Sequence, residues 1–257
     1  MSRLFDGVDD KISYGDVDAI DGAGAMTIDF WTMPIVLTSL DVFVGKVDNS
    51  LSTGWVMETG VGGVGDEDDL IASVDGNNYG FTTSNIFANN TWIFLGYIFD
   101  GSLTGNANRL KVYTYKPATK TWTQETLTFT GTIPATLPST THSLRLGATH
   151  DDVRFYNGRL AHVHIATVAY TEGQLRQRLH NPNYRTSSGE VLMAPLNFAT
   201  EPDWSGSAQT ATLTGTSIAD NPPVAPWYGY DLGWMGAIAA PAPAGGTWPG
   251  YIGGGWF

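Results

Sequence analysis

Short apolar segments separated by turn residues recur along the chain, and they limit the fold more than any other feature of the sequence. In residues 25–31, Met26, Ile28 and Phe30 alternate with other residues and therefore share one face of a strand. Residues 92–99 are almost all β-branched or aromatic, which predicts a central strand buried on both faces. Further short strands are expected at residues 42–44, 55–57, 70–72, 109–115, 143–147 and 159–169. This pattern predicts an antiparallel β-sandwich.

One segment carries the signals of a helix. Thr171 and Gln174 fit a capping box, in which the threonine hydroxyl accepts a backbone N–H and the glutamine reaches back to the cap. Leu175 and Leu179 share a face four residues apart, and the Asn-Pro pair at 181–182 ends the helix. The predicted fold class is therefore all-β with one short helix.

The composition of the chain changes near residue 222. The 257 residues are 42% hydrophobic and 15% charged, which suffices for one large core. The last 32 residues hold nine Gly, four Pro and eight aromatic residues but a single charged side chain, Asp231. Such a segment has too few aliphatic residues for a core of its own. We therefore predict a sandwich domain at residues 1–222 and an extended Gly/Pro/aromatic arm at residues 223–257.

Charge and cysteine content exclude several classes of function. With a net charge of −12, the chain lacks the basic surface that binding to nucleic acid or anionic lipid requires. It has no cysteine, so disulfides and thiolate metal sites are excluded. The N-terminus lacks an apolar signal segment, and no stretch reaches the roughly 18 apolar residues of a membrane span. We expect a protein that is made in a cytoplasm and binds neither nucleic acid nor membrane.

Four segments form an ordered set of motifs. Residues 4–12 read Leu-Phe-Asp-Gly-Val-Asp-Asp-Lys-Ile, residues 26–34 contain Thr-Ile-Asp-Phe-Trp, and residues 155–165 begin Phe-Tyr-Asn-Gly. Residues 90–97, between the second and the last of these segments, contain Trp-Ile-Phe-Leu-Gly. In the family that this set resembles, a Trp-His-His-Val-Ala strand stands at this place, so Ile93 and Phe94 replace its two histidines. The set resembles the laminin-G-like, or concanavalin A-like, jelly-roll family in the form common in bacterial and phage proteins. The resemblance covers about residues 1–182 and implies a two-sheet antiparallel jelly roll.

A fifth motif lies out of place. Residues 203–207 and 211–215 resemble the segment that usually opens such a domain, but here they follow its body. Two interpretations of residues 186–222 remain open. The segment completes the sandwich, or it is a lead-in to a further segment that does not amount to a second full domain.

The spacing of carboxylates argues against catalysis. Glycosidases with this fold use a Glu-x-Asp-x-x-Glu strand, which points the nucleophile and the acid into one groove. That motif is absent, and the acidic stretch at residues 66–69 follows a Gly-rich run that predicts a loop. A hydrolase or lyase is therefore the least favoured class. We predict a non-enzymatic protein with no catalytic residues.

Pairs of Asp and Asn in predicted turns offer the oxygen ligands that calcium prefers. Our first candidates are Asp48 with Asn49 and Asp151 with Asp152, and residues 9–10 form another such pair. None of the pairs has the fixed spacing of an EF-hand loop. The alternative is that these residues cap the backbone of their own turns. Calcium is therefore the one cofactor that the sequence leaves open.

Two histidines on one predicted strand form a further candidate. His162 and His164 are two residues apart and should point to the same face, as ligands of a transition metal or catalytic groups would. No third ligand stands at a fixed spacing from them. The alternative is that both are packing or surface residues.

The aromatic residues of the arm would form an exposed apolar ribbon in water, so we predict that they bind a partner. They are Trp227, Tyr228, Tyr230, Trp234, Trp248, Tyr251, Trp256 and Phe257.

Two compatible hypotheses of function follow from the resemblance and the arm. The first is a structural protein of a bacteriophage virion, either a capsid decoration (cement) protein or a tail or fibre component, docked through its arm on other protein subunits or on copies of itself. The second is a carbohydrate-binding lectin for host-surface glycans, found in the cytoplasm or released without a classical signal if it acts alone. Aromatic residues available for a sugar platform are Trp55, Tyr79, Phe81, Trp122, Tyr156 and Trp204.

Overall fold

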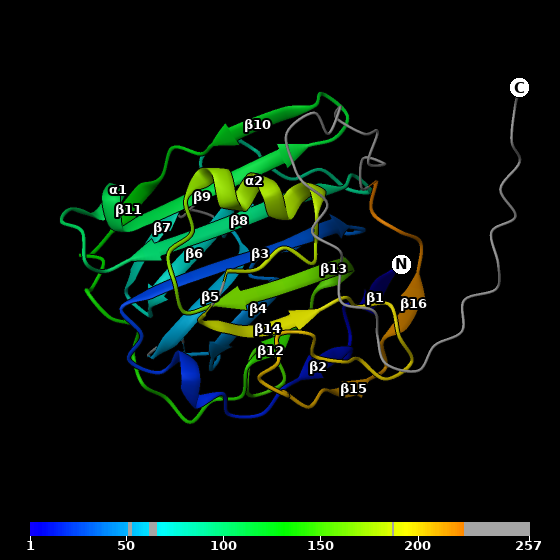
Figure 1. The fold of residues 1–257 in the computed structure, drawn as a ribbon. Helices are drawn as coiled ribbons and strands as arrows, with labels where there is room; N and C mark the ends of the chain where they lie inside the picture. Colours follow the sequence, from blue (N-terminus) through cyan, green and yellow to red (C-terminus); the bar gives the residue numbers. More distant parts are fainter. Residues whose placement is uncertain (51–52, 62–65, 187, 224–257) are drawn as a thin grey trace, which may run out of the picture. The chain divides into compact units, whose positions relative to one another are not determined.

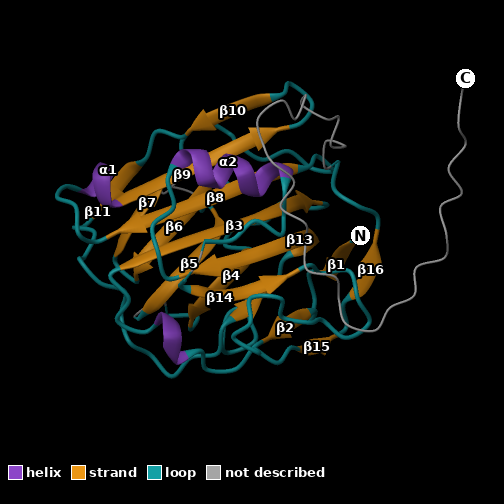
Figure 2. Cartoon of the chain, viewed as in Figure 1, coloured by secondary structure: helices purple, strands orange, loops and turns teal. Residues whose placement is uncertain are grey.

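The computed structural model describes residues 1–50, 53–61, 66–186 and 188–223. Within this range two antiparallel sheets of eight strands each pack face to face (Figure 1). The helical segments are few and short (Figure 2). The two-sheet antiparallel sandwich predicted from the sequence is confirmed.

The first sheet has the strand order β10-β9-β8-β3-β13-β1-β16, and β14 also pairs with β13. Its strands are β1 (Ser2–Asp6), β3 (Ala25–Pro34), β8 (Ile93–Asp100), β9 (Leu110–Lys116), β10 (Thr121–Gln124), β13 (Asn157–Ala166), β14 (Glu190–Ala194) and β16 (Ser217–Ala219). One edge of β13 is shared: β1 pairs with its first half and β14 with its second half. The two partners leave a junction at the middle of β13, beside His162.

The second sheet has the strand order β11-β7-β6-β5-β4-β12-β2-β15. Its strands are β2 (Lys11–Ser13), β4 (Val42–Val47), β5 (Gly54–Thr59), β6 (Leu70–Asp75), β7 (Asn78–Phe81), β11 (Thr128–Thr130), β12 (Arg145–Leu146) and β15 (Thr212–Thr214). Residues from nearly the whole described chain therefore contribute to this sheet.

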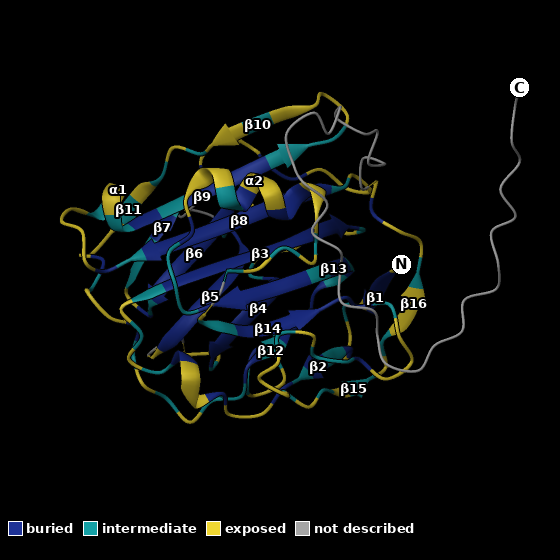
Figure 3. Cartoon of the chain, in the orientation of Figure 1, coloured by how far each residue is buried: buried dark blue, intermediate teal, exposed yellow. Residues whose placement is uncertain are grey.

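Alternation along β3 divides its side chains between two apolar clusters. Met26, Ile28 and Phe30 are fully buried in the core between the sheets. Trp31 belongs to a second cluster, on the opposite face of the first sheet, together with Phe94 of β8. Strand β8 is therefore buried on both faces, as its composition predicts, and Figure 3 shows its ribbon as buried along most of its length.

The second cluster is closed by helix α2 (Glu172–His180), which lies across the outer face of the first sheet (Figure 1). The predicted capping box is present, with both the Thr171 and the Gln174 side chains bonded to backbone N–H groups. Leu175 and Leu179 pack on the sheet. A one-turn helix α1 (Asn106–Arg109) and a 3-10 turn η1 (Asp18–Ile20) add to the single helix that the sequence predicts. Neither has a hydrophobic pattern long enough to be recognised in the sequence.

Three strands in the described part of residues 186–222 complete the sandwich. Strand β14 extends the first sheet, β15 pairs with β2 in the second sheet, and β16 pairs with β1 at the edge of the first. Of the two interpretations left open by the sequence, the first is therefore the one that the structure shows.

Gly96 of β8 sets how closely α2 approaches the sheet, because a Cβ at this position would lie 2.3 Å from Leu175 Cδ2. In G96A the helix must move away from the sheet or the side chains must shift. We expect the free energy of unfolding to fall by about 1–3 kcal/mol, measured by urea denaturation.

The matched control is G173A, on α2 itself. The nearest atom to a Cβ there is Thr171 Oγ1 at 3.9 Å, so this variant should be as stable as the parent or more stable by up to about 1 kcal/mol. Unchanged stability of G96A would mean that α2 does not rest on β8 as described.

Candidate functional site

Two aromatic rings stand out on the surface. Phe198 and Trp204 are each 42% exposed, and they are the only aromatic rings among the exposed large hydrophobic side chains of the described residues. Their ring centroids lie 5.7 Å apart with an interplanar angle of 68°. We refer to Phe198 and Trp204 as the aromatic pair. A contact of this kind between two exposed rings keeps apolar surface in water and is typical of a binding site.

Trp204 is held in place by the carboxylate of its neighbour Asp203. That carboxylate accepts the backbone N–H groups of Met193, Ser205 and Gln209 at 3.0, 2.8 and 3.0 Å, and the Ser205 hydroxyl at 2.7 Å. The Trp204 backbone N–H also donates to the Met193 carbonyl at 2.9 Å. These bonds fasten residues 203–209 to β14, so the backbone that carries the indole is fixed.

Phe198 is held by a second carboxylate, that of Glu201. Its oxygens accept the backbone N–H groups of Leu196 and Phe198, each at 3.0 Å. Glu201 is buried and forms an ion pair with buried Arg3 of β1 at 3.1 Å. Arg3 in turn donates to the Phe198 carbonyl. The loop that carries Phe198 is therefore anchored to the first strand of the chain.

An open polar cleft lies beside the backbone of Trp204, although neither ring of the aromatic pair is among its lining residues. It has a volume of about 490 Å³ and is lined by residues 185–186, 188–190 and 205–207. The Arg185 guanidinium links the two features, because it lines the cleft and donates to the Trp204 carbonyl at 3.1 Å. Serine, threonine and glycine make up most of the lining. The cleft thus offers short polar groups, and Ser205 in its lining directly follows Trp204 in the chain.

The wall of the cleft is stiffened by a buried ionic network. His164 of β13 places Nδ1 2.7 Å from Asp29 Oδ2 and Nε2 2.5 Å from Glu190 Oε2. Arg178 of α2 donates from Nε to both oxygens of Asp29 at 3.1 Å. Asp29, His164 and Arg178 are all buried. The network therefore joins β3, β13, β14 and α2 at one point.

The two carboxyls of this network are held in their charged forms. Burial alone would raise the pKa of Asp29, but the charges of Arg178 and His164 and their hydrogen bonds outweigh it, and the pKa lies below its ordinary value. Burial likewise opposes ionisation of Glu190, and its bonds to His164, Tyr170 and Thr186 lower the pKa overall. Both groups therefore contribute stability only when ionised.

Glu190 transmits this network to the rim of the cleft. Its Oε1 atom accepts the Tyr170 hydroxyl at 2.7 Å and the Thr186 backbone N–H at 2.8 Å. Thr186 is one of the cleft-lining residues. No local pattern in the sequence indicates this arrangement, because Asp29, His164 and Glu190 come from three different strands.

The calcium candidates each have protein partners. Asp152 lies 2.9 Å from Lys11 Nζ and also contacts Arg145, and although burial opposes ionisation these two cations lower its pKa. Asp151 accepts the Thr149 hydroxyl at 2.8 Å. Asn49 accepts from Arg154 Nε at 2.9 Å, and Asp48 Oδ2 lies 4.0 Å from His142 Nε2. Within the described residues, the structure does not bring the two pairs together in one group of carboxylates.

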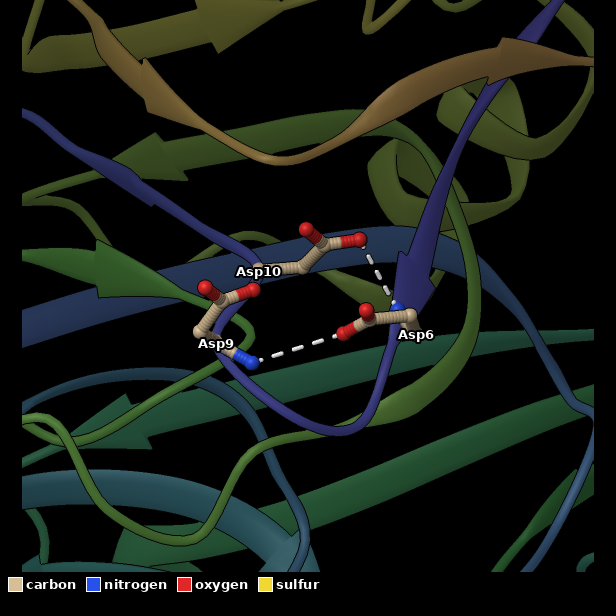
Figure 4. A group of neighbouring side chains, drawn as sticks. All are labelled: Asp6, Asp9 and Asp10. Atoms are coloured by element: carbon tan, nitrogen blue, oxygen red, sulfur yellow. Dashed lines mark hydrogen bonds between the residues drawn. The ribbon is translucent and has the colours of Figure 1, made fainter.

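A different acidic group does form in the β1–β2 turn. Asp6, Asp9 and Asp10 each place a carboxylate oxygen within 4.8 Å of the others (Figure 4). Asp6 accepts the N–H of Val8 at 2.8 Å, and Asp10 accepts the N–H of Asp6 at 2.9 Å. Gly215 packs on Asp10 so closely that a Cβ there would lie 1.7 Å from its Oδ1. Capping of the turn's own backbone, the alternative weighed from the sequence, accounts for these bonds.

The two histidines of β13 do not form a metal pair. A bulge lies between Ala161 and His164, and His162 has a positive φ of 53°. His164 is engaged by two carboxylates, while burial lowers the pKa of His162 to about 4 and keeps it neutral. The simple alternation that put both on one face ignores the bulge.

Of the other five aromatic residues predicted for a sugar platform, two are buried and three are half-buried, among them Tyr79 and Phe81, whose ring centroids lie 6.3 Å apart. Trp55 and Tyr156 are fully buried in the core, and Trp122 stacks on Tyr113 beneath the Arg176 guanidinium. Trp204 alone of the six is exposed. All eight aromatic residues predicted to bind a partner lie beyond residue 223, outside the described residues.

No helix in the described part of the chain is both long and apolar enough to cross a membrane.

A glutamine at position 190 removes one charge from the buried network while keeping its size. We expect E190Q to lower the free energy of unfolding at pH 7 by about 3 kcal/mol, because it leaves the remaining charges of the network unbalanced. The stability that a carboxylate of lowered pKa contributes is complete above its unfolded pKa of about 4.5 and is lost as the pH falls. E190Q should therefore show a flatter fall in stability below about pH 4.5.

E172Q is the control, since Glu172 pairs with Arg176 on the exposed side of α2 at 2.7 Å. Such a pair contributes less than about 0.5 kcal/mol. Chemical denaturation of the three proteins between pH 3 and pH 8 provides the measurement. Equal losses in the two variants would contradict the role given to the network.

Comparisons with known proteins agree with this architecture. No protein-family model matches the chain, and no curated protein matches it. Among solved structures, it is similar to a candidate carbohydrate-binding protein from Bacteroides ovatus, with a TM-score of 0.62 and 17% identity over 86% of this chain. The match covers 60% of that protein, so this chain spans less than two thirds of its length.

Two further structures are similar at lower scores. A heptameric pentraxin from Limulus polyphemus matches with a TM-score of 0.47 and 11% identity, over 84% of this chain and 93% of that one. The LG1-3 region of the laminin alpha2 chain matches with a TM-score of 0.46 and 12% identity, over 66% and 32%. Identities this low concern the fold alone. The chain has an all-β, two-sheet antiparallel jelly-roll fold.

Proposed function

We propose that the protein is a non-enzymatic carbohydrate-binding module, and that the aromatic pair and the adjoining cleft are its sugar site. One observation carries the proposal: two exposed rings stand on backbone fixed by carboxylates, and Ser205, the residue after Trp204, lines an open polar cleft. A pyranose has one face of C–H groups, which suits an indole, and a rim of hydroxyls, which suits short polar side chains.

The rigidity of the site lowers the entropy cost of binding a small ligand. Asp203 and Glu201 fix the backbone on both sides of the aromatic pair before any ligand binds. A sugar that stacks there loses its own freedom but does not have to order the protein. The similar structure from Bacteroides ovatus is itself described as a candidate carbohydrate-binding protein, and this description supports the proposal of a sugar site.

The carboxylates near the cleft support a binding role rather than hydrolysis. A glycosidase needs two carboxyl groups that flank the scissile bond and are free to exchange protons. Both carboxylate oxygens of Glu190 are hydrogen-bonded, to His164, Tyr170 and Thr186. The Asp203 carboxylate accepts four hydrogen bonds. Neither is available to act as nucleophile or acid.

Truncation of the indole tests the site. We expect W204A to weaken binding to any glycan found on an array by at least about tenfold, as loss of an aromatic anchor does, measured by isothermal titration calorimetry. L103A, which shortens an exposed side chain elsewhere, should bind like the parent. Equal binding by W204A would place the sugar elsewhere, and an array without hits for the folded protein would end the proposal.

A second function, assembly in a bacteriophage virion, rests on the sequence of the arm. Its supporting observation is the concentration of eight aromatic residues in the last 32 positions, which a protein partner would cover. Capsid decoration and a place in a tail or fibre are both compatible with it. The two functions are compatible with each other as well, since a virion component can present a sugar site to the host surface.

A truncation after Val224 tests the assembly function, because Met1–Val224 forms one compact unit. We expect the truncated chain to be a monomer of unchanged melting temperature, and the full chain to self-associate or to join a larger particle. Light scattering and thermal unfolding of the two proteins provide the comparison. Two equally monomeric proteins would remove the arm's role in self-assembly.

A further inference from the structure

Among the described residues that line the cleft, Arg185 is the one charged group without an ion pair. Its side chain is exposed and lines the cleft, and a single N–H, on Nη1, is used for the Trp204 carbonyl. Among the described residues it takes part in no salt bridge, and its Nε and Nη2 atoms have no protein acceptor. A guanidinium with free N–H groups beside a binding cleft can accept an anionic ligand.

The charges of the buried network beside the cleft balance one another. Glu190 faces His164 at 2.5 Å, and Asp29 faces both His164 and Arg178. Asp203 is surrounded by backbone and hydroxyl donors. Among the described lining residues, Glu190 is thus balanced and Arg185 is not, whereas Asp203, which lies outside the lining, keeps its negative charge. The whole chain has a net charge of −12.

The bond from Arg185 to the Trp204 carbonyl also fixes where this charge lies. It places the guanidinium beside the backbone of the residue whose indole is exposed for stacking. A sugar ring that stacks on the indole can then direct a carboxylate substituent toward the guanidinium. The planar fork of arginine matches the two oxygens of a carboxylate better than it matches a hydroxyl.

The rest of the protein argues against a polyanion. Sulfated polysaccharides need several basic groups in a row, and their many charges would be repelled by a protein with an excess of twelve acidic charges. One carboxylate per bound sugar fits one arginine.

We infer that the cleft binds a sugar with a single carboxylate, such as a uronic acid at a chain end, through Arg185 and the stacked Trp204. This inference rests on the proposed function and names the class of its ligand.

The experiment compares two ligands that differ only at C6, methyl β-glucuronide and methyl β-glucoside, by ligand-observed NMR titration of the full chain. We expect the glucuronide to bind about tenfold more tightly, the effect of one charge-assisted contact. In R185Q the ratio of the two dissociation constants should fall to near one. R176Q is the matched control, because Arg176 is exposed and pairs with Glu172 on α2, and it should keep the full preference.

Each other outcome is decisive. Equal dissociation constants in the parent protein overturn the inference and leave the sugar site standing. A preference that survives in R185Q assigns the anion to another residue and overturns the role of Arg185. Tighter binding of heparin than of the glucuronide overturns the single-carboxylate class. If the folded protein binds neither methyl glycoside nor any array glycan, the proposed function itself fails.

Discussion

The contact of His164 with two carboxylates is the interaction on which the rest of the first sheet depends. A neutral imidazole has one N–H, so hydrogen bonds at both nitrogens require two protons on the ring or one on a carboxyl. With the imidazolium form, Asp29 and Glu190 balance His164 and Arg178, and no net charge is buried. Because these residues come from three strands and a helix, the network fixes the position of α2 and of β14 together.

This arrangement limits where aromatic side chains can be exposed on the first sheet. The outer face of the first sheet is covered by α2, and β8 beneath it is buried on both sides. Among the described residues, the exposed aromatic side chains lie instead where the chain runs past β14 and β1, at Trp204 and Phe198. The candidate site lies on loops, but each loop is bonded to a strand of the rigid sheet.

The sequence predicts local features well and distant ones poorly. Alternation in β3 and the capping box of α2 depend on residues within a few positions of each other, and both are present. By contrast, Arg3 and Glu201 pair across almost the whole chain, and no local pattern links them. Trp55 and Trp204 look alike in the sequence, yet one is in the core and the other is exposed. The bulge between Ala161 and His164 likewise makes the prediction wrong that His162 and His164 share one face, because that prediction assumes regular alternation.

Asp203 performs two tasks with one carboxylate. Strand β14 has β13 on one side only, so the N–H of Met193 on its other side needs an acceptor, and Asp203 supplies it. Residues 203–209 thereby cover an edge that could otherwise pair with another chain. The same bonds hold the backbone of Trp204, so protection of the edge and presentation of the indole cannot be separated by changing this residue. The motif at residues 203–207 therefore links the stability of the sandwich to the geometry of its binding surface.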